Sequence, residues 1–181
     1  MFLIFVDVNE SLCKLIPITI FSLNDLNELD SSISNLNIPS WSFNDELSMI
    51  ELNLNRFVNL ESIEVGNDCF GSIETFQIEG LNRLKRLKIG DNSFTQVKLN
   101  DFDNDWDGSI SKCRNESKSF HILNCESLKM IEIGCCSFAD FGSEFELRNL
   151  DNLESIKIGK IEFISLNFYW SSFNIRGITL K

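Results

Sequence analysis

Hydrophobic residues recur along this chain in a fixed pattern that is not helical. In the clearest copy, apolar side chains stand at Leu84, Leu87 and Ile89, and the pattern closes with Asn92 and Phe94. The alternation of apolar and polar residues within the copy predicts a short strand with one buried face. Five copies with this spacing occupy residues 33–43, 60–70, 84–94, 128–138 and 153–163.

The copies repeat at a regular interval. Neighbouring copies begin about 25 residues apart, except for one longer interval that contains an insertion. A second apolar element precedes the strand at Phe76, Phe120 and Phe145, and its alternation predicts another extended segment in each unit. Glycine follows the strand in four copies, where we expect a positive φ to help the chain turn: Gly66, Gly90, Gly134 and Gly159.

Residues 84–94 and 128–138 resemble leucine-rich repeats, whose pattern is L-x-x-L-x-L-x-x-N/C-x-L. The run Ile-Gly-x-x-Ser-Phe at residues 89–94 is also similar to the BspA-type subclass of protist and bacterial surface proteins. Trp41 and Ile161 depart from the pattern in the first and last copies. The resemblance implies a mainly β solenoid, a curved stack of about five units with a parallel sheet on its concave face. It also implies a protein-binding or adhesion module, and it transfers no catalytic residue.

We therefore expect a single leucine-rich-repeat domain over residues 1–181, with an N-terminal packing segment at 1–32, repeats at 33–180 and a loop insertion at 101–119. In the first segment, the alternation of Ile16, Ile18 and Ile20 predicts an edge strand, and the leucines at positions 23, 26 and 29 suggest a divergent unit. Phe173 and Ile175 begin a further unit. Open repeat ends expose core and strand edges, so self-association through them is expected to be possible.

Stacked parallel strands would align equivalent side chains in rows, about 4.8 Å apart. One such row reads Asn37, Glu64, Lys88, Glu132 and Lys157, so the sign of the charge alternates along it. In one interpretation these rows only keep the sheet soluble and in register. In the other, a basic stripe on an acidic protein binds an acidic partner. The candidate binding residues are Arg83, Lys85, Arg86, Lys88, Lys129, Glu132 and Lys157.

The insertion contains the one segment that resembles a metal-binding loop. Asp103, Asp105 and Asp107, followed by glycine, reproduce the opening of an EF-hand calcium loop and are the candidate ligands. Arg114 stands at the twelfth position, where calcium requires a bidentate glutamate, and no amphipathic helix flanks the loop. We therefore expect no cofactor, and weak Ca²⁺ binding is the alternative to a solvated acidic loop.

Composition narrows the range of partners and compartments. The formal net charge of -11 argues against nucleic acid or an anionic membrane as the partner. No apolar run approaches the roughly 18 residues of a membrane span, and the apolar opening of the chain lacks the basic n-region of a signal peptide. The six cysteines include no C-x-x-C pair, which favours buried thiols in a reducing, intracellular compartment over zinc or disulfides.

These patterns predict a non-catalytic scaffold that binds an unidentified protein. His121 is the only histidine, and no serine or cysteine with an aspartate stands around it at a known triad spacing, so we expect no enzyme activity. We expect free thiols at Cys135 and Cys136, because adjacent cysteines pair only with strain. The alternative function is a structural or self-assembling surface or adhesion component that binds calcium weakly through the insertion.

Overall fold

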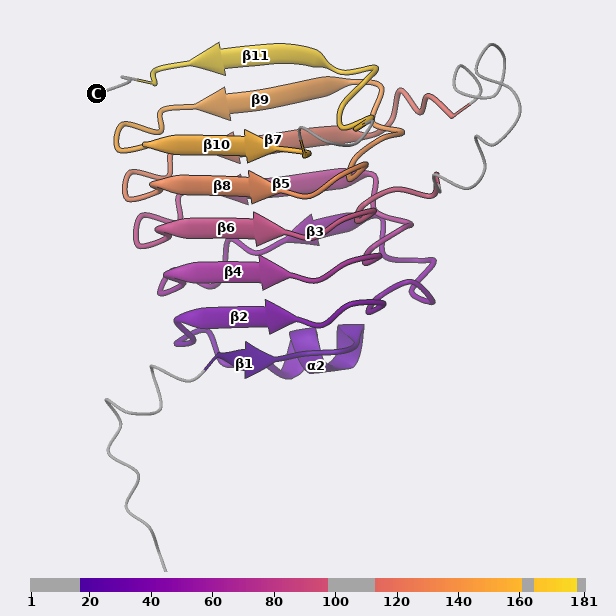
Figure 1. The fold of residues 1–181 in the computed structure, drawn as a ribbon. Coiled ribbons are helices and arrows are strands. Elements are labelled where there is room, and N and C mark those ends of the chain that lie inside the picture. The colour runs from indigo at the N-terminus through magenta and orange to yellow at the C-terminus, as the bar shows by residue number, and fades with distance from the viewer. Residues whose placement is uncertain (1–16, 98–112, 161–164, 179–181) are drawn as a thin grey trace, which may run out of the picture.

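The chain is mainly β and forms two parallel sheets (Figure 1). The computed structural model describes residues 17–97, 113–160 and 165–178. The first sheet contains Ile18–Thr19 (β1), Asn35–Ile38 (β2), Ser62–Val65 (β4), Arg86–Ile89 (β6), Met130–Ile133 (β8) and Ser155–Ile158 (β10). The second contains Glu51–Asn53 (β3), Thr75–Glu79 (β5), Ser119–Leu123 (β7), Glu144–Arg148 (β9) and Ser172–Arg176 (β11). Among the described residues the only helix is Leu23–Glu28 (α2).

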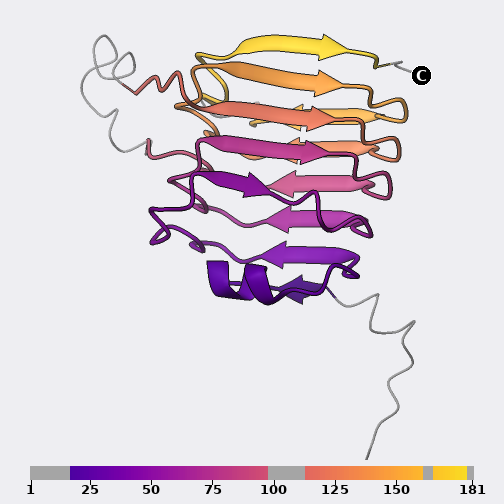
Figure 2. The same cartoon turned by 180° about the vertical axis from the view of Figure 1, so that it is seen from behind.

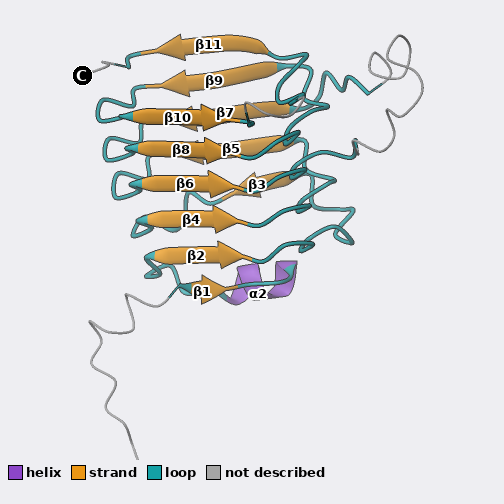
Figure 3. Ribbon diagram, viewed as in Figure 1, coloured by secondary structure: helices purple, strands orange, loops and turns teal. Residues whose placement is uncertain are grey.

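The two sheets lie face to face, and their strands point in opposite directions (Figures 1 and 2). The first sheet has the order β1-β2-β4-β6-β8-β10, and the second has the order β11-β9-β7-β5-β3. From β3 onward the chain passes from one sheet to the other and back, and each pass adds one strand beside its predecessor. The prediction of a second extended segment is confirmed, because strands rather than helices form this side of the units (Figure 3).

The predicted register of the first sheet is confirmed from β2 to β10. Leu87 lies beside Ile63 on one side and Ile131 on the other, and Ile131 lies beside Ile156. Leu87 and Ile131 are fully buried, because their side chains point at the second sheet. Parallel pairing without slippage places every core position of one copy against the same position of the next.

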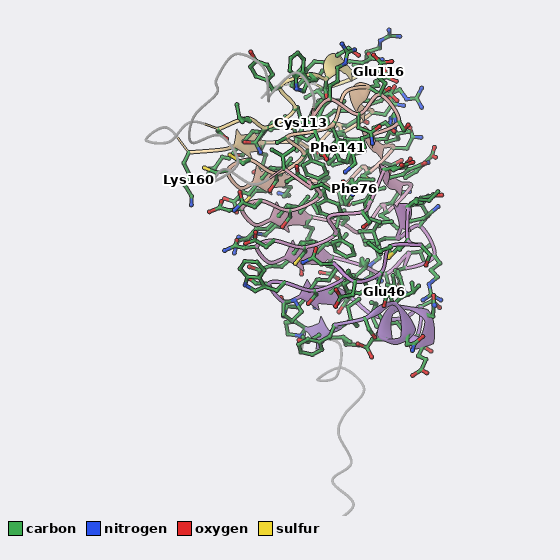
Figure 4. All side chains as sticks on the ribbon, turned by 90° about the vertical axis from the view of Figure 1, so that its right-hand side faces the viewer. Glu46, Phe76, Cys113, Glu116, Phe141 and Lys160 are labelled. Atoms are coloured by element: carbon green, nitrogen blue, oxygen red, sulfur yellow. The ribbon has the colours of Figure 1, made fainter. Side chains whose placement is uncertain are left out.

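Phenylalanine fills the space between the sheets in two columns. The first column stacks neighbouring rings with centroids 4.6–4.9 Å apart: Phe43, Phe70, Phe94, Phe138 and Phe168. The second stacks Phe76, Phe120 and Phe145 with centroids 5.0 Å apart, and the tilted ring of Phe173 follows at 4.8 Å from Phe145. Edge-to-face contacts join the columns, as between Phe120 and Phe138 at 5.0 Å. Phe76 lies in this interior, whereas Lys160 projects outward (Figure 4).

The expected role of three glycines is wrong. Of the four glycines for which a positive φ was expected, Gly66, Gly90, Gly134 and Gly159, only Gly159 has one. A Cβ on Gly90 would lie 2.5 Å from the carbonyl carbon of Gly66, and one on Gly134 would lie 2.5 Å from that of Gly90. These glycines are therefore required by close contact between neighbouring units. The left-handed backbone occurs later in the turn, at Asn92 and Phe94 and at their equivalents in other copies.

The N-terminal segment differs from a divergent repeat. β1 pairs with β2, as the alternation predicted, and Ile20 is buried. Of the spaced leucines that follow, Leu23 and Leu26 belong to α2 and Leu29 is its C-cap residue, and Leu26 is buried against the end of the stack. A capping box starts this helix: the Asp25 amide donates to the Ser22 hydroxyl at 3.3 Å, and the Ser22 amide donates to the Asp25 carboxylate at 3.0 Å.

The last copy also departs from the expected pattern. In the copy at 153–163, the repeat pattern predicts that Ile156 and Ile158 are nearly fully buried, but each is 39% exposed, because β10 is the edge strand of its sheet among the described residues. On the side away from Phe94, the ring that stacks on Phe138 is that of Phe168. Phe163 of the aligned copy lies outside the described residues.

The loop insertion was expected at 101–119, but the last residues of this range already belong to the packed fold. Ser119 is the first residue of β7, and Lys118 is buried. Asn115 already forms a parallel bridge to Phe141. The expected insertion therefore ends before Asn115, and its segment 101–112 lies outside the described residues.

Candidate interaction surface

The first sheet directs its charged side chains away from the core in regular rows. Because side chains alternate along a strand, Leu87 of β6 points inward, and Arg86 and Lys88 point outward. The predicted row is confirmed, since Lys88 lies between Glu64 on β4 and Glu132 on β8. We call this surface the charged face, and it consists of Glu61, Glu64, Arg83, Lys85, Arg86, Lys88, Lys129, Glu132, Glu154 and Lys157.

Ion pairs join neighbouring strands across the centre of the charged face. Lys88 pairs with Glu64. Glu132 accepts hydrogen bonds from two sides, from Lys157 Nζ at 3.1 Å and from Arg86 Nη2 at 3.1 Å. These two cations lower the pKa of the Glu132 carboxyl, with the hydrogen bond from Lys157 as the larger cause. Glu132 is therefore held in its charged form by strands on both sides.

A second set of ion pairs lies just before the first residues of the strands. Glu61 accepts from Lys85 Nζ at 2.7 Å and from Arg83 Nη2 at 3.2 Å. The hydrogen bond from Lys85 is the main cause that lowers the pKa of Glu61. Two copies further along, Lys129 Nζ lies 3.1 Å from Glu154 Oε1.

The seven candidate binding residues thus lie together on one face, but its cations do not stand alone. Six basic side chains share four glutamates. The face is a mixed surface with an excess of basic groups rather than a purely basic stripe. The lysine side chains stay accessible, as Lys157 is 65% exposed and Lys85 57%. A role in binding stays a prediction.

The sequence patterns did not predict two of the ion pairs. Lys160 Nζ lies 2.7 Å from Asp91 Oδ2, and this hydrogen bond raises the pKa of Lys160. Lys118 and Asp140 form a buried pair at 3.0 Å, and the lysine also donates to the Gly71 carbonyl. The partners in each pair come from different units, and no local pattern connects them. Only the stacking of the units could have revealed either pair.

The calcium hypothesis concerns residues that the structure does not describe. Asp103, Asp105 and Asp107 lie outside the described residues. Arg114, at the position where a calcium loop needs glutamate, is described, and its guanidinium pairs with Glu116 at 3.2 Å. Calcium binding therefore stays a prediction.

The described cysteines are thiols and form no disulfide, and this includes the adjacent Cys135 and Cys136. Cys125 and Cys136 are buried, as their positions in the repeat predicted. Burial raises the pKa of the Cys125 thiol to about 11 and also raises that of Cys136. Both thiols are therefore protonated near neutral pH, which makes them poor nucleophiles and poor metal ligands.

Comparisons with protein-family models, with curated proteins and with solved structures gave no match to this chain. Among the described residues, the structure holds no helix with the length and apolar character to cross a membrane.

Proposed function

We propose that this chain is a non-catalytic, protein-binding scaffold of the leucine-rich-repeat type. The repeat reading is supported by units that follow the leucine-rich-repeat pattern, stack in parallel and keep one register from β2 to β10. The protonated state of Cys125 and Cys136 supports a role without a thiol nucleophile. In a stack of this kind, the broad sheet surface is the natural contact area for a partner.

The observation that carries the proposal is the charged face. Glu64, Arg86, Lys88 and Glu132 stand on β4, β6 and β8, each of which pairs with a strand on both edges. Lys157 stands on the edge strand β10, and the other charged side chains lie just before these strands, so the charges are presented in an ordered array. Surface ion pairs contribute only about 0–1 kcal/mol each, so a partner's carboxylates can replace the internal glutamates at little cost. The excess of basic groups favours a protein partner with an acidic, extended contact segment.

Binding assays with paired variants test this proposal. Lys85→Gln with Lys129→Gln removes two exposed cations from the charged face. Arg148→Gln with Arg176→Gln, on the outward side of β9 and β11, removes the same charge from the second sheet. For a partner recovered with the wild-type chain, we expect the first pair to weaken binding at least tenfold and the second to leave it unchanged. Equal affinity for wild type and the first pair would place the binding surface elsewhere.

A second candidate function, self-assembly through a repeat end, has its own supporting observation. β10 and β11 are terminal strands, and both expose large apolar side chains. Phe173 is 57% exposed and Ile175 is 52% exposed, next to the half-exposed Ile156 and Ile158. A second copy could extend both sheets there and cover these side chains.

Light scattering over a wide concentration range tests self-assembly. We expect the particle mass of the wild-type chain to rise with concentration. The double variant Phe173→Lys/Ile175→Lys should keep the mass of a monomer. Val58→Lys, at a site of similar exposure away from this end, is the matched control. A wild-type chain that is monomeric throughout would exclude the second candidate.

A further inference from the structure

One cluster of metal-ligating side chains lies on the second sheet, on the side of the molecule opposite to the charged face. His121 of β7 is the direct neighbour of Glu146 on β9, and both point outward. Glu144 precedes Glu146 by two residues and therefore lies on the same face of β9. Ligand atoms of the three side chains all lie within 4.8 Å of one another.

The three groups are set in a sheltered row of polar side chains. His121 is flanked by Gln77 on β5 and Glu146 on β9, and Glu146 is followed by Asn174 on β11. Neighbours on both sides leave the His121 side chain only 20% exposed and the Glu146 side chain only 14% exposed. Both strands are held in ladders on both edges, so their backbone positions are preorganised.

The charges around this cluster leave a place for a cation. Two carboxylates converge on one imidazole, and His121 Nδ1 lies 3.5 Å from Glu146 Oε2. Arg148 Nε lies 3.7 Å from Glu146 Oε1, and Asn174 donates a neutral hydrogen bond to Glu144 at 2.8 Å. Like charges this close repel one another, and a divalent ion between them would turn that repulsion into attraction.

We propose that His121, Glu144 and Glu146 form a binding site for a divalent transition-metal ion of the Zn²⁺ class. Nitrogen and carboxylate ligands suit this class, whereas Ca²⁺ and Mg²⁺ take oxygen ligands. Tetrahedral ligands about 2.1 Å from an ion stand about 3.4 Å apart, so small rotations of the two glutamates close the shell. Three protein ligands leave the fourth position to water. The site is independent of the charged face and of the function proposed for it.

The single histidine allows a direct test on the full chain. Zn²⁺ is titrated while the imidazole signals of His121 are followed by NMR, and calorimetry gives the affinity. We expect the ring signals to shift and to saturate at one equivalent of Zn²⁺. Ring signals that do not move under saturating Zn²⁺ would overturn the proposal, since any remaining heat would then belong to the thiols or to other carboxylates.

Conservative variants separate a metal site from an ordinary ion pair. Glu146→Gln and Glu144→Gln each remove a charged ligand with little change of shape, and each should weaken Zn²⁺ binding at least about tenfold. Glu51→Gln, on the outward side of β3 in the same sheet, should leave the affinity unchanged. Wild-type affinity in both ligand variants would reduce the cluster to a pair between His121 and Glu146 and would sink the proposal.

Discussion

At the scale of single residues, close contact between units decides which residue types fit in the turns. Gly66, Gly90 and Gly134 form a column in which each backbone touches the next. The adjacent serines reinforce it: Ser93 Oγ donates to the Gly66 carbonyl at 2.8 Å, and Ser137 Oγ donates to the Gly90 carbonyl at 2.6 Å. These contacts satisfy carbonyl groups where the chain leaves the strand.

Replacing Gly90 by alanine should therefore destabilise the fold. The new Cβ would lie 2.5 Å from the Gly66 carbonyl carbon, and backbone cannot move aside without breaking the ladder. We expect a loss of about 1–3 kcal/mol in the free energy of unfolding, measured by denaturant titration. Gly71→Ala is the control, because its nearest contact is 3.5 Å away. Equal stabilities of the two variants would contradict the contact argument.

The buried pair of Lys118 and Asp140 supports a second prediction at this scale. Lys118→Met leaves the Asp140 carboxylate buried without its cation, and one of its oxygens already lacks a hydrogen-bond partner. Breaking such a pair costs about 3–5 kcal/mol of unfolding free energy. Arg114→Met, which breaks the exposed pair with Glu116, should cost far less. A small loss in Lys118→Met would mean that solvent reaches Asp140.

At the scale of the elements, the rows of charges link strands that are far apart in sequence. Lys88 stands between Glu64 and Glu132, and Glu132 also forms ion pairs with Arg86 and Lys157. Each contact is weak by itself. The same geometry repeated over four strands nevertheless favours one register, because a slip of one residue would bury the charges and expose the core.

Reversing one charge in the centre tests this coupling between strands. Lys88→Glu places a third acid between Glu64 and Glu132, and we expect a loss of about 1 kcal/mol, partly restored by salt. Arg176→Glu makes the same change of charge beside Arg148 on the neighbouring strand and should not destabilise. Thermal melts at low and high salt measure both. If Lys88→Glu melts like wild type at low salt, the row contributes nothing to stability.

At the scale of the whole molecule, paired carboxylates make stability depend on acid. The pKa values of Glu61 and Glu132 are lowered in the folded chain, chiefly by hydrogen bonds from Lys85 and Lys157. A carboxyl whose pKa is lowered by folding stabilises the fold above its unfolded pKa. That contribution is lost as the pH falls through the folded pKa.

The pH dependence of the melting temperature should reflect these two carboxyl groups. We expect wild type to lose stability from about pH 4.3 downward, and Glu61→Gln with Glu132→Gln to lose less over the same range. Glu28→Gln, an exposed position on α2, is the control and should follow wild type. Parallel curves for wild type and the double variant would show that these ion pairs do not couple to folding.

The amino-acid sequence alone determined the strands, their register and their inward faces. These features follow from the alternation of apolar and polar residues within a copy and from the recurrence of the copies along the chain. Both are properties of the sequence that do not change when the units stack. Leu87, Ile131 and the first phenylalanine column up to Phe138 lie where the repeat places them. The row of Glu64, Lys88 and Glu132 also follows from register alone.

Only the tertiary structure decided the features that depend on what surrounds a residue. Ile156 and Ile158 repeat the core pattern but are half-exposed, because β10 is the last strand of its sheet among the described residues. Leu23 and Leu26, before the first repeat, lie in a capped helix that packs on the end of the stack. Lys118 meets Asp140, and His121 meets Glu146, across units. Such pairings join side chains that are distant in sequence, and folding alone brings them together.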